Sequence, residues 1–156
     1  MRGAGHAVRL GADIDTDVVI AGRYLRTKDR SIWAAHVFED LDPSIAPRLS
    51  GAVIVAGRNF GCGSSREQAA IALKEAGVVA VVAPSFARIF FRNAINIGLP
   101  LIESDLSCPD GTMVRFDLNS GWVESGGNRR PVPLLSPRML DILHAGGLVE
   151  YWKVKR

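Results

Sequence analysis

The fold is decided by residues 52–102, which read AVIVAGRNFGCGSSREQAAIALKEAGVVAVVAPSFARIFFRNAINIGLPLI. Two continuous apolar runs, at 52–56 and 78–83, have the pattern of strands buried on both faces of a sheet. Between them, the sequence predicts a helix over 65–76 that ends at Gly77, because glycine is common just after a helix C-terminus.

A second helix is expected to follow, with Ser85 as its cap and Ile97 near its end. Residues 99–102 then predict a short third strand. Strands that alternate with helices at this spacing favour crossover connections and parallel pairing. The middle of the chain therefore indicates a parallel sheet with helices packed on it.

The flanking thirds have a different character. Residues 7–10 predict a strand, and residues 113–132 alternate and turn in the manner of a small antiparallel meander. Ser136, with a proline directly behind it, predicts the start of a helix. Residues 148–154 are expected to form a closing strand. Asp29 or Ser31 is a candidate cap for a short helix earlier in the chain.

Composition supports one folded domain over residues 1–156. Hydrophobic residues make up 47% and charged residues 22%, which is enough apolar surface for a core and argues against global disorder. We therefore expect an α/β fold with a central, partly parallel sheet, flanking helices and a small antiparallel meander. The net charge is +3, from 19 Lys and Arg against 16 Asp and Glu, and the basic residues form no long stripe, so no nucleic-acid partner is expected.

The cysteines exclude several classes of site. Two are present, Cys62 and Cys108, which is too few for a disulfide framework, a four-cysteine zinc site or an iron–sulfur cluster with three or four cysteine ligands from this chain. This usage favours a reducing, cytoplasmic compartment. The N-terminus has no apolar signal-peptide segment, and the longest apolar run, at 78–84, is too short to span a membrane, so no membrane partner is expected.

The richest stretch for chemistry is residues 57–67, between a buried strand and a helix N-terminus. Ligands bind at this position in open α/β sheets, because backbone N–H groups and the helix dipole favour anions there. Ser64, Ser65 and Arg66 add two hydroxyls and a clamp for a carboxylate or phosphate. A structural alternative stays open, since Ser64 and Glu67 fit a capping box. Neither a Walker A loop nor a GxGxxG fingerprint is present.

Three other groups of polar residues are candidates for binding or reactivity. Asp13, Asp15, Thr16 and Asp17 could bind a hard cation or form a polar turn that caps a helix, and the EF-hand spacing is missing. In residues 23–26, the two arginines that flank Tyr24 are typical of a protein surface. At the same time, Cys62 is expected to favour its thiolate at the helix N-terminus and to be sensitive to oxidation.

Several motifs together resemble one known family. Residues 55–69 read VAGRNFGCGSSREQA, and DIDTD at 13–17, PSFARIF at 84–90, NAINIGLP at 93–100 and AGGL at 145–148 match in the same order. They are similar to the swivel domain of the aconitase superfamily, and in particular to the separate small subunits of 3-isopropylmalate dehydratase and homoaconitase. The resemblance covers nearly the whole chain and implies a swivel-type β/β/α domain.

The resemblance also implies a mechanism. A large partner subunit would hold a [4Fe–4S] cluster, with no cofactor bound by this chain, and a small di- or tricarboxylate would be dehydrated and rehydrated so that its hydroxyl moves to the adjacent carbon. Ser64 would be the base that takes the carbon-bound proton. Ser65 and Arg66 would bind substrate carboxylate, while Thr16 and Asp17 would face the same pocket. A helix N-terminus and an arginine are suited to stabilising a serine alkoxide.

The substrate depends on the residues after Tyr24. In the family, the loop there contacts the variable end of the substrate, and apolar residues suit an isopropyl group. Arg26 instead suits a distal carboxylate, as in homoaconitate. Isopropylmalate isomerisation in leucine biosynthesis is the first expectation, with homoaconitase or dual specificity as the alternative. A non-catalytic anion-binding domain is an alternative of another class. Without its partner, the subunit is expected to self-associate.

Overall fold

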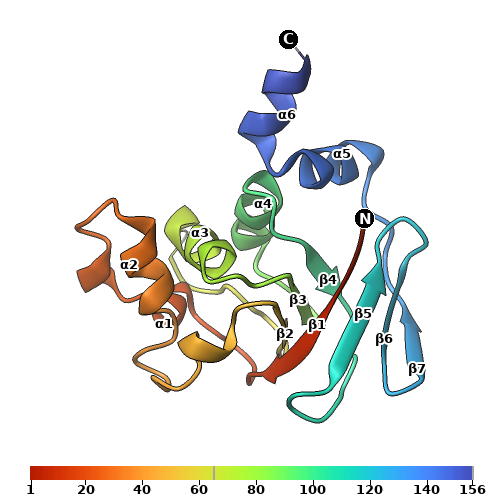
Figure 1. Cartoon of the computed structure of the whole chain (residues 1–156), viewed down its shortest axis with the longest axis horizontal. Coiled ribbons are helices and arrows are strands. Elements are labelled where there is room, and N and C mark those ends of the chain that lie inside the picture. The colour runs from red at the N-terminus through yellow and green to blue at the C-terminus, as the bar shows by residue number, and fades with distance from the viewer. Residues whose placement is uncertain (65, 156) are drawn as a thin grey trace.

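Seven strands form one continuous sheet in the computed structural model, which describes residues 1–64 and 66–155. Their order across the sheet is β4-β3-β2-β1-β5-β6-β7 (Figure 1). The strands are β1 (Arg2–Arg9), β2 (Ala52–Val55), β3 (Ala80–Ala83), β4 (Leu101–Glu103), β5 (Met113–Asp117), β6 (Trp122–Ser125) and β7 (Asn128–Pro131).

One half of the sheet is parallel, as the alternation of strands and helices predicts. In this half, β1 pairs with β2 so that Val8 lies opposite Ile54, and β2 pairs with β3 so that Ile54 lies opposite Val81. The next pair, β3 with β4, is parallel too, and places Val81 opposite Leu101. The predicted buried strands at 52–56 and 78–83 are therefore confirmed within a residue or two at their ends.

The other half is antiparallel and forms the predicted meander. Arg2 of β1 lies opposite Asp117 of β5, and Val123 of β6 lies opposite both Phe116 of β5 and Arg130 of β7. Because β1 borders both halves, the sheet is mixed, which confirms the expected partly parallel α/β fold. The sheet curls between these halves, with the meander standing to one side of the helices (Figure 1).

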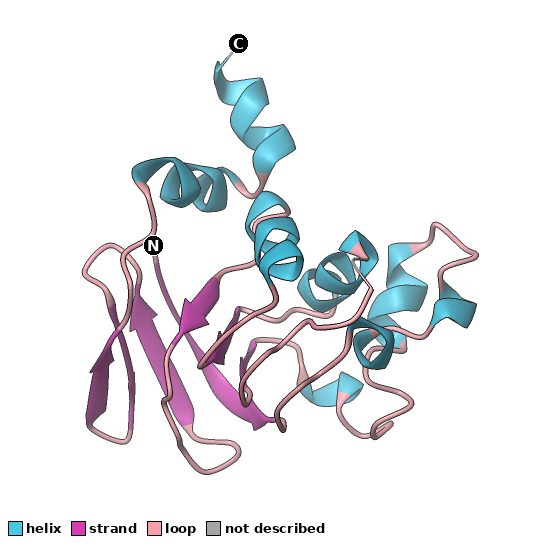
Figure 2. Cartoon of the chain, turned by 180° about the vertical axis from the view of Figure 1, so that it is seen from behind, coloured by secondary structure: helices cyan, strands magenta, loops and turns pink. Residues whose placement is uncertain are grey.

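The parallel half is buried on both faces, which explains the continuous apolar runs in its strands. Alternate strand residues enter two separate clusters, with Val8 and Ile54 in the first, which helices cover, and Ala7, Val53 and Val55 in the second, which the curled meander covers together with the helix at 137–145. Figure 2 shows the same arrangement from behind. The helices are α1 (Thr16–Val19), α2 (Arg30–Ala35), α3 (Glu67–Glu75), α4 (Arg88–Asn96), α5 (Pro137–Ala145) and α6 (Leu148–Lys155), with 3-10 turns η1 (Gly22–Tyr24) and η2 (Ala46–Arg48).

The predicted closing strand at 148–154 is wrong, because this segment is the helix α6. Leu148 and Tyr151 pack against the second cluster, at the i, i+3 spacing of one helix face. Val149, Trp152 and Val154 remain exposed on a helix that projects from the body of the molecule (Figure 1). Within the described residues, no helix combines the length and the apolar character needed to cross a bilayer.

Two predicted helix starts also differ from the structure. The helix α4 begins at Arg88 with Ala87 as its N-cap, whereas the hydroxyl of Ser85 accepts a hydrogen bond from the Asn59 N–H at 2.8 Å. Ser85 thus ties two loops together. The helix α3 begins at Glu67, and the predicted start at Ser65 lies outside the described residues.

Candidate active site

The two loops that follow the neighbouring parallel strands β1 and β2 lie side by side. Four backbone hydrogen bonds join them: Gly57 N–H to Gly11 O at 3.0 Å, Asp13 N–H to Arg58 O at 2.8 Å, Gly61 N–H to Ile14 O at 2.8 Å, and Thr16 N–H to Cys62 O at 2.9 Å. Carboxyl ends of parallel strands meet at the same edge of a sheet, where ligands bind in such folds. The pairing brings the acidic segment 13–17 against the glycine-bearing loop.

The acidic segment forms a capped helix start, one of its two predicted interpretations. The Asp15 carboxylate is the N-cap of α1 and accepts the Asp17 N–H at 2.7 Å. Among the described residues, no group of three His, Cys, Asp or Glu side chains is placed to hold a metal ion. Thr16 is 1% exposed, and its hydroxyl donates to the Ser64 carbonyl at 2.6 Å. Thr16 therefore fixes the backbone of Ser64 from the neighbouring loop.

Glycine is required where the loop passes Asp15. Gly63 has φ of +88°, a left-handed conformation, and a Cβ at this position would overlap the Asp15 carboxylate. Gly61, with φ of +85°, lies equally close to the Phe90 ring of α4. These two glycines let the loop run between α1 and α4 and deliver Ser64 to the start of α3.

Ser64 is exposed and is not a helix cap. The N-cap residue of α3 is Arg66, and in the described part of the chain no side chain caps this helix. The predicted capping box between Ser64 and Glu67 is therefore wrong. The Ser64 hydroxyl has no hydrogen bond to a described residue, while its carbonyl is held by Thr16. A fixed backbone with a free hydroxyl leaves this side chain available to a ligand.

Arg66 lies between the two loops, with a guanidinium that is only partly engaged. Its Nη2 pairs with the Asp17 carboxylate at 3.2 Å, and its side chain is 30% exposed. Its Nη1 is buried without a hydrogen-bond partner among the described residues. Gly22 gives it room, because a Cβ there would lie 3.3 Å from Nη1. An unpaired buried donor costs free energy, so it indicates a place where a ligand oxygen would be stabilised.

Cys62 differs from its prediction. Partial burial, together with the Asp15 and Asp13 carboxylates, raises the pKa of the thiol, whereas the sequence position favoured a thiolate. Burial is the larger cause of the raised pKa, and the two carboxylates on the adjoining loop add to it. Cys62 is therefore not an activated nucleophile in this site.

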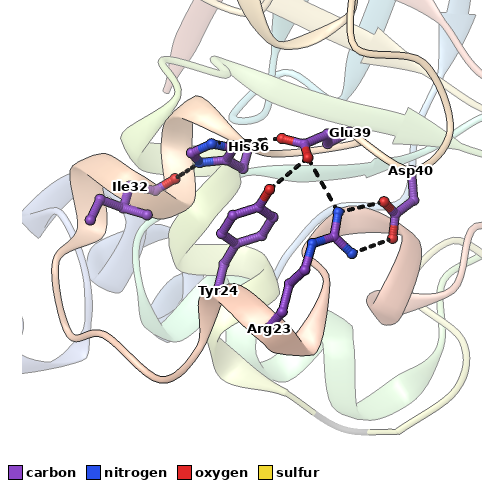
Figure 3. A network of polar contacts seen from close by, with 6 residues as sticks. All are labelled: Arg23, Tyr24, Ile32, His36, Glu39 and Asp40. Atoms are coloured by element: carbon purple, nitrogen blue, oxygen red, sulfur yellow. Dashed lines mark hydrogen bonds and ion pairs between the residues drawn. The ribbon is translucent and has the colours of Figure 1, made fainter.

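Of the remaining candidates, Arg26 is exposed, and Ser65 lies outside the described residues. The segment that leads to Arg26 is tied to the body of the molecule by Arg23 and Tyr24 (Figure 3). The two arginines of this segment are therefore not equivalent, because Arg23 is engaged by Asp40 and Glu39 whereas Arg26 has no ion pair in the described part of the chain. This network was not predicted from the sequence.

Residues 13–105 match the aconitase C-terminal domain family. The chain belongs to this family. It is 51% identical to the methanogen homoaconitase small subunit of Methanothermobacter thermautotrophicus, over 95% of this chain and 89% of that protein. It is 50% identical to the 3-isopropylmalate dehydratase small subunit of Moorella thermoacetica, over 94% of this chain and 92% of that protein. The crystal structure of 3-isopropylmalate dehydratase from Methanocaldococcus jannaschii superposes with a TM-score of 0.93 at 44% identity, covering 99% of this chain and 95% of that one.

The resemblance seen in the sequence motifs is thus confirmed, and so is the swivel-type fold. The matched range contains both loops of the site, from Asp13 through Ser64 and Arg66. It also contains the segment with Arg26. This aconitase-type domain therefore has its candidate residues within the part of the chain that defines the family.

An iron–sulfur cluster, which the family implies, does not fit the described side chains of this aconitase-type domain. Cys108 is buried in the second hydrophobic cluster, and Cys62 lies in the loop beside Asp15. The sequence has no third cysteine. Cluster ligands would have to come from another chain.

Proposed function

We propose that this chain is the small subunit of a two-chain hydro-lyase of the 3-isopropylmalate dehydratase type, built as one swivel-type domain over residues 1–156. It would interconvert 2-isopropylmalate and 3-isopropylmalate, a step of leucine biosynthesis, in the cytoplasm. The observation that carries this proposal is the state of Ser64. Its carbonyl is fixed by Thr16, its hydroxyl is free of described partners, and α3 does not use it as a cap.

Ser64 is assigned as the base. Its oxygen takes the carbon-bound proton of the substrate, the C–H electron pair becomes the second bond of an alkene, and the hydroxyl of the neighbouring carbon leaves with its bonding pair as hydroxide, which a Lewis acid on the partner chain would stabilise. Hydroxide then adds to the carbon that lost its proton, and Ser64 returns that proton to the carbon that lost its hydroxyl. A serine is a poor base unless its alkoxide is stabilised, and the α3 N-terminus and Arg66 supply positive potential at this point.

Arg66 is assigned to a substrate carboxylate. A guanidinium binds a carboxylate through two parallel N–H donors, and the unpaired Nη1 beside Gly22 is such a donor. Asp17 holds the other nitrogen, Nη2, and so orients the fork. Thr16 acts by holding Ser64 rather than by reaching the pocket with its hydroxyl. Ser65 is proposed as a further carboxylate ligand on its family motif alone.

The partner is proposed to be a cluster-bearing large subunit. The relatives in Methanothermobacter thermautotrophicus and Moorella thermoacetica are named small subunits, which supports a second chain. A Lewis acid on that chain would supply the pull on the leaving hydroxyl. The exposed apolar side chains of α6, Val149, Trp152 and Val154, are consistent with self-association of the isolated chain.

Homoaconitase is the second candidate function, and Arg26 favours it. Arg26 is exposed and has no ion pair with a described residue, so it is free to bind a distal carboxylate. The relative named a homoaconitase small subunit, at 51% identity, supports the same alternative. A non-catalytic anion-binding domain is the candidate of another class. Such a domain would need the arginine of this loop to bind the anion, but it would have no need of the serine as a base.

Turnover after anaerobic reconstitution with the cognate large subunit tests these alternatives. Isopropylmalate and homoaconitate are assayed side by side for the wild type, Ser64→Ala and Arg26→Val. Loss of a homoaconitate preference in Arg26→Val would assign a homoaconitase. Good turnover of isopropylmalate that Arg26→Val leaves unchanged would assign the leucine-pathway enzyme. Retained turnover in Ser64→Ala would contradict the role of Ser64, and no turnover of either substrate with an intact cluster would reject both reactions.

A further inference from the structure

The position of Arg26 depends on the two residues that lead to it. Its own side chain has no ion pair in the described part of the chain, so its guanidinium is located by the backbone alone. Directly before it, η1 spans Gly22–Tyr24, and Gly22 lies against Arg66 of the candidate site. A shift of this segment would therefore change the geometry between Arg26 and Arg66.

Arg23 ties the segment to the chain beyond α2. Its two terminal nitrogens bind the two oxygens of Asp40 at 3.1 and 2.7 Å, a bidentate arrangement, and Nη2 also reaches Glu39 at 3.2 Å (Figure 3). Bidentate pairs fix orientation as well as distance.

Tyr24 is held on three sides. Its hydroxyl donates to Glu39 at 2.5 Å, and its ring stacks on His36 with centroids 4.1 Å apart and planes 17° apart (Figure 3). Its carbonyl accepts the Trp33 indole N–H at 3.0 Å. His36 is itself held at 2.7 Å by a hydrogen bond between Nδ1 and the Ile32 carbonyl. A residue held through its hydroxyl, its ring and its backbone carbonyl has little freedom to move.

Charge states at neutral pH suit this arrangement. The hydrogen bond from Tyr24 lowers the pKa of Glu39, with Arg23 adding to the effect, so Glu39 stays a carboxylate. The same bond to Glu39 raises the pKa of Tyr24, so the phenol stays a donor. The side chains of Glu39 and His36 are each 33% exposed and that of Arg23 is 52% exposed. Exposed ion pairs add little to the free energy of unfolding, so their effect is greater on local position than on global stability.

We infer that Tyr24 and Glu39 are positioning residues for substrate discrimination, because they hold the η1 segment so that Arg26 meets the distal end of the substrate. This inference rests on the proposed function and deepens it, since neither residue touches substrate. Preorganised side chains bind with a smaller loss of conformational freedom than mobile ones. Tyr24 and Glu39 should thus affect a substrate with a distal carboxylate and spare one with a distal alkyl group.

The test compares Tyr24→Phe, which removes the hydroxyl and keeps the stacked ring, with Glu39→Gln, each in the full chain reconstituted with the large subunit. The matched control is Glu124→Gln, which removes an exposed carboxylate paired at 2.8 Å with Arg129 on the meander. We expect Tyr24→Phe to raise KM for homoaconitate about fivefold, as for a coupled pair of residues, with kcat and the isopropylmalate KM unchanged. In an Arg26→Val background, the same substitution should change neither KM.

Equal effects on both substrates, or an effect that persists without Arg26, would overturn the inference. Hydrogen exchange of the free subunit tests the positioning role of Tyr24 and Glu39 independently of the proposed function. The amides of Tyr24 and Leu25, which donate to the Ala21 and Gly22 carbonyls at 3.1 Å, should lose protection in Tyr24→Phe and Glu39→Gln and keep it in Glu124→Gln. If neither substrate is turned over, the proposed function fails, and unchanged protection of these amides would overturn the positioning role as well.

Discussion

Ser64 and Ser136 each precede a helix of this chain, and the two serines have different roles. Ser136 is the N-cap of α5, where its hydroxyl accepts the Met139 N–H at 3.2 Å and a proline occupies the first turn. Ser64 precedes α3 by three residues, and the N-cap there is Arg66, with no cap from a described side chain. The Ser136 hydroxyl serves as a helix cap, whereas the Ser64 hydroxyl has no hydrogen bond to a described residue.

The difference lies in what surrounds each helix start. The helix α5 buries Ile142 and Leu143 in the second cluster, and its first turn is capped by the Ser136 hydroxyl. At α3, the loop after β1 approaches, and Thr16 binds the Ser64 carbonyl. A serine at a helix start is therefore a candidate for catalysis when a neighbouring segment fixes its backbone and the helix does not use its hydroxyl.

The largest expected difference between the two serines is the effect of their substitution on turnover. Ser64→Ala should lower kcat of the reconstituted enzyme by about 10²- to 10⁴-fold, as for loss of a general base. Its midpoint of thermal unfolding should match that of the wild type, because no cap is lost. Steady-state assays and calorimetry on the same preparations measure both. A large drop in the midpoint would mean that Ser64 is structural, like Ser136.

A smaller effect on turnover is expected at Arg66, the N-cap residue of α3. Arg66→Lys keeps the charge but removes the fork, so KM should rise by roughly 10- to 100-fold, as for a lost charge-assisted hydrogen bond. Titration with a substrate-like dicarboxylate measures the same loss without turnover. The control is Arg129→Lys, at an exposed pair on the meander. Equal KM values for wild type and Arg66→Lys would contradict a bidentate contact.

At Ser136 the expected change is in stability. Ser136→Ala should lower the free energy of unfolding by about 1 kcal/mol, the usual cost of a lost N-cap. For a domain of this size that shifts the thermal midpoint by about 2–4 °C. The reconstituted enzyme should keep its kcat. A loss of turnover without a loss of stability would contradict the contrast between the two serines, because Ser136 would then act as a catalytic group and not as a cap.

The smallest effect concerns a third helix start, that of α2. Its cap Asp29 accepts the Ser31 hydroxyl at 2.6 Å and the Ser31 N–H at 3.0 Å, and these bonds lower its pKa. The stabilisation is therefore complete above the usual aspartate pKa of about 3.9 and is lost as the pH falls through the lower folded value. Asp29→Asn should flatten the acid limb of stability against pH. Asp141→Asn, at an exposed position of α5, should leave that limb unchanged.

Much of the fold is predictable from the sequence because its signals are local. The buried runs at 52–56 and 78–83, the cap at Ser136 and the cap at Asp29 all match the structure. The segment 148–154 was mistaken for a strand, because a short apolar run does not by itself distinguish a strand from a helix. The helix is favoured because Leu148 and Tyr151 then pack on the second cluster, and the residues of that cluster are distant in the sequence.

The candidate site is predictable in its residues and less so in their roles. The motif identifies Ser64 and Arg66, but Thr16 as the clamp on Ser64 depends on a contact across 48 positions of the chain. The pKa of Cys62 is raised mainly by burial and further by carboxylates on another loop, and both depend on contacts distant in the sequence. The Tyr24 network likewise depends on residues beyond α2, such as Glu39, that carry no motif of their own.

The central place of β1 has a consequence for the order in which the molecule is assembled. Residues 2–9 are made before residues 113–117, yet Arg2 pairs with Asp117, so the two halves of the sheet cannot join until β5 has been made. Such long-range pairing slows folding, because a large loop must close before its contacts form. During synthesis, the edge of β1 that pairs with β5 therefore stays open until residues 113–117 have been made, whereas the edge that pairs with β2, beside the candidate site, can close much earlier.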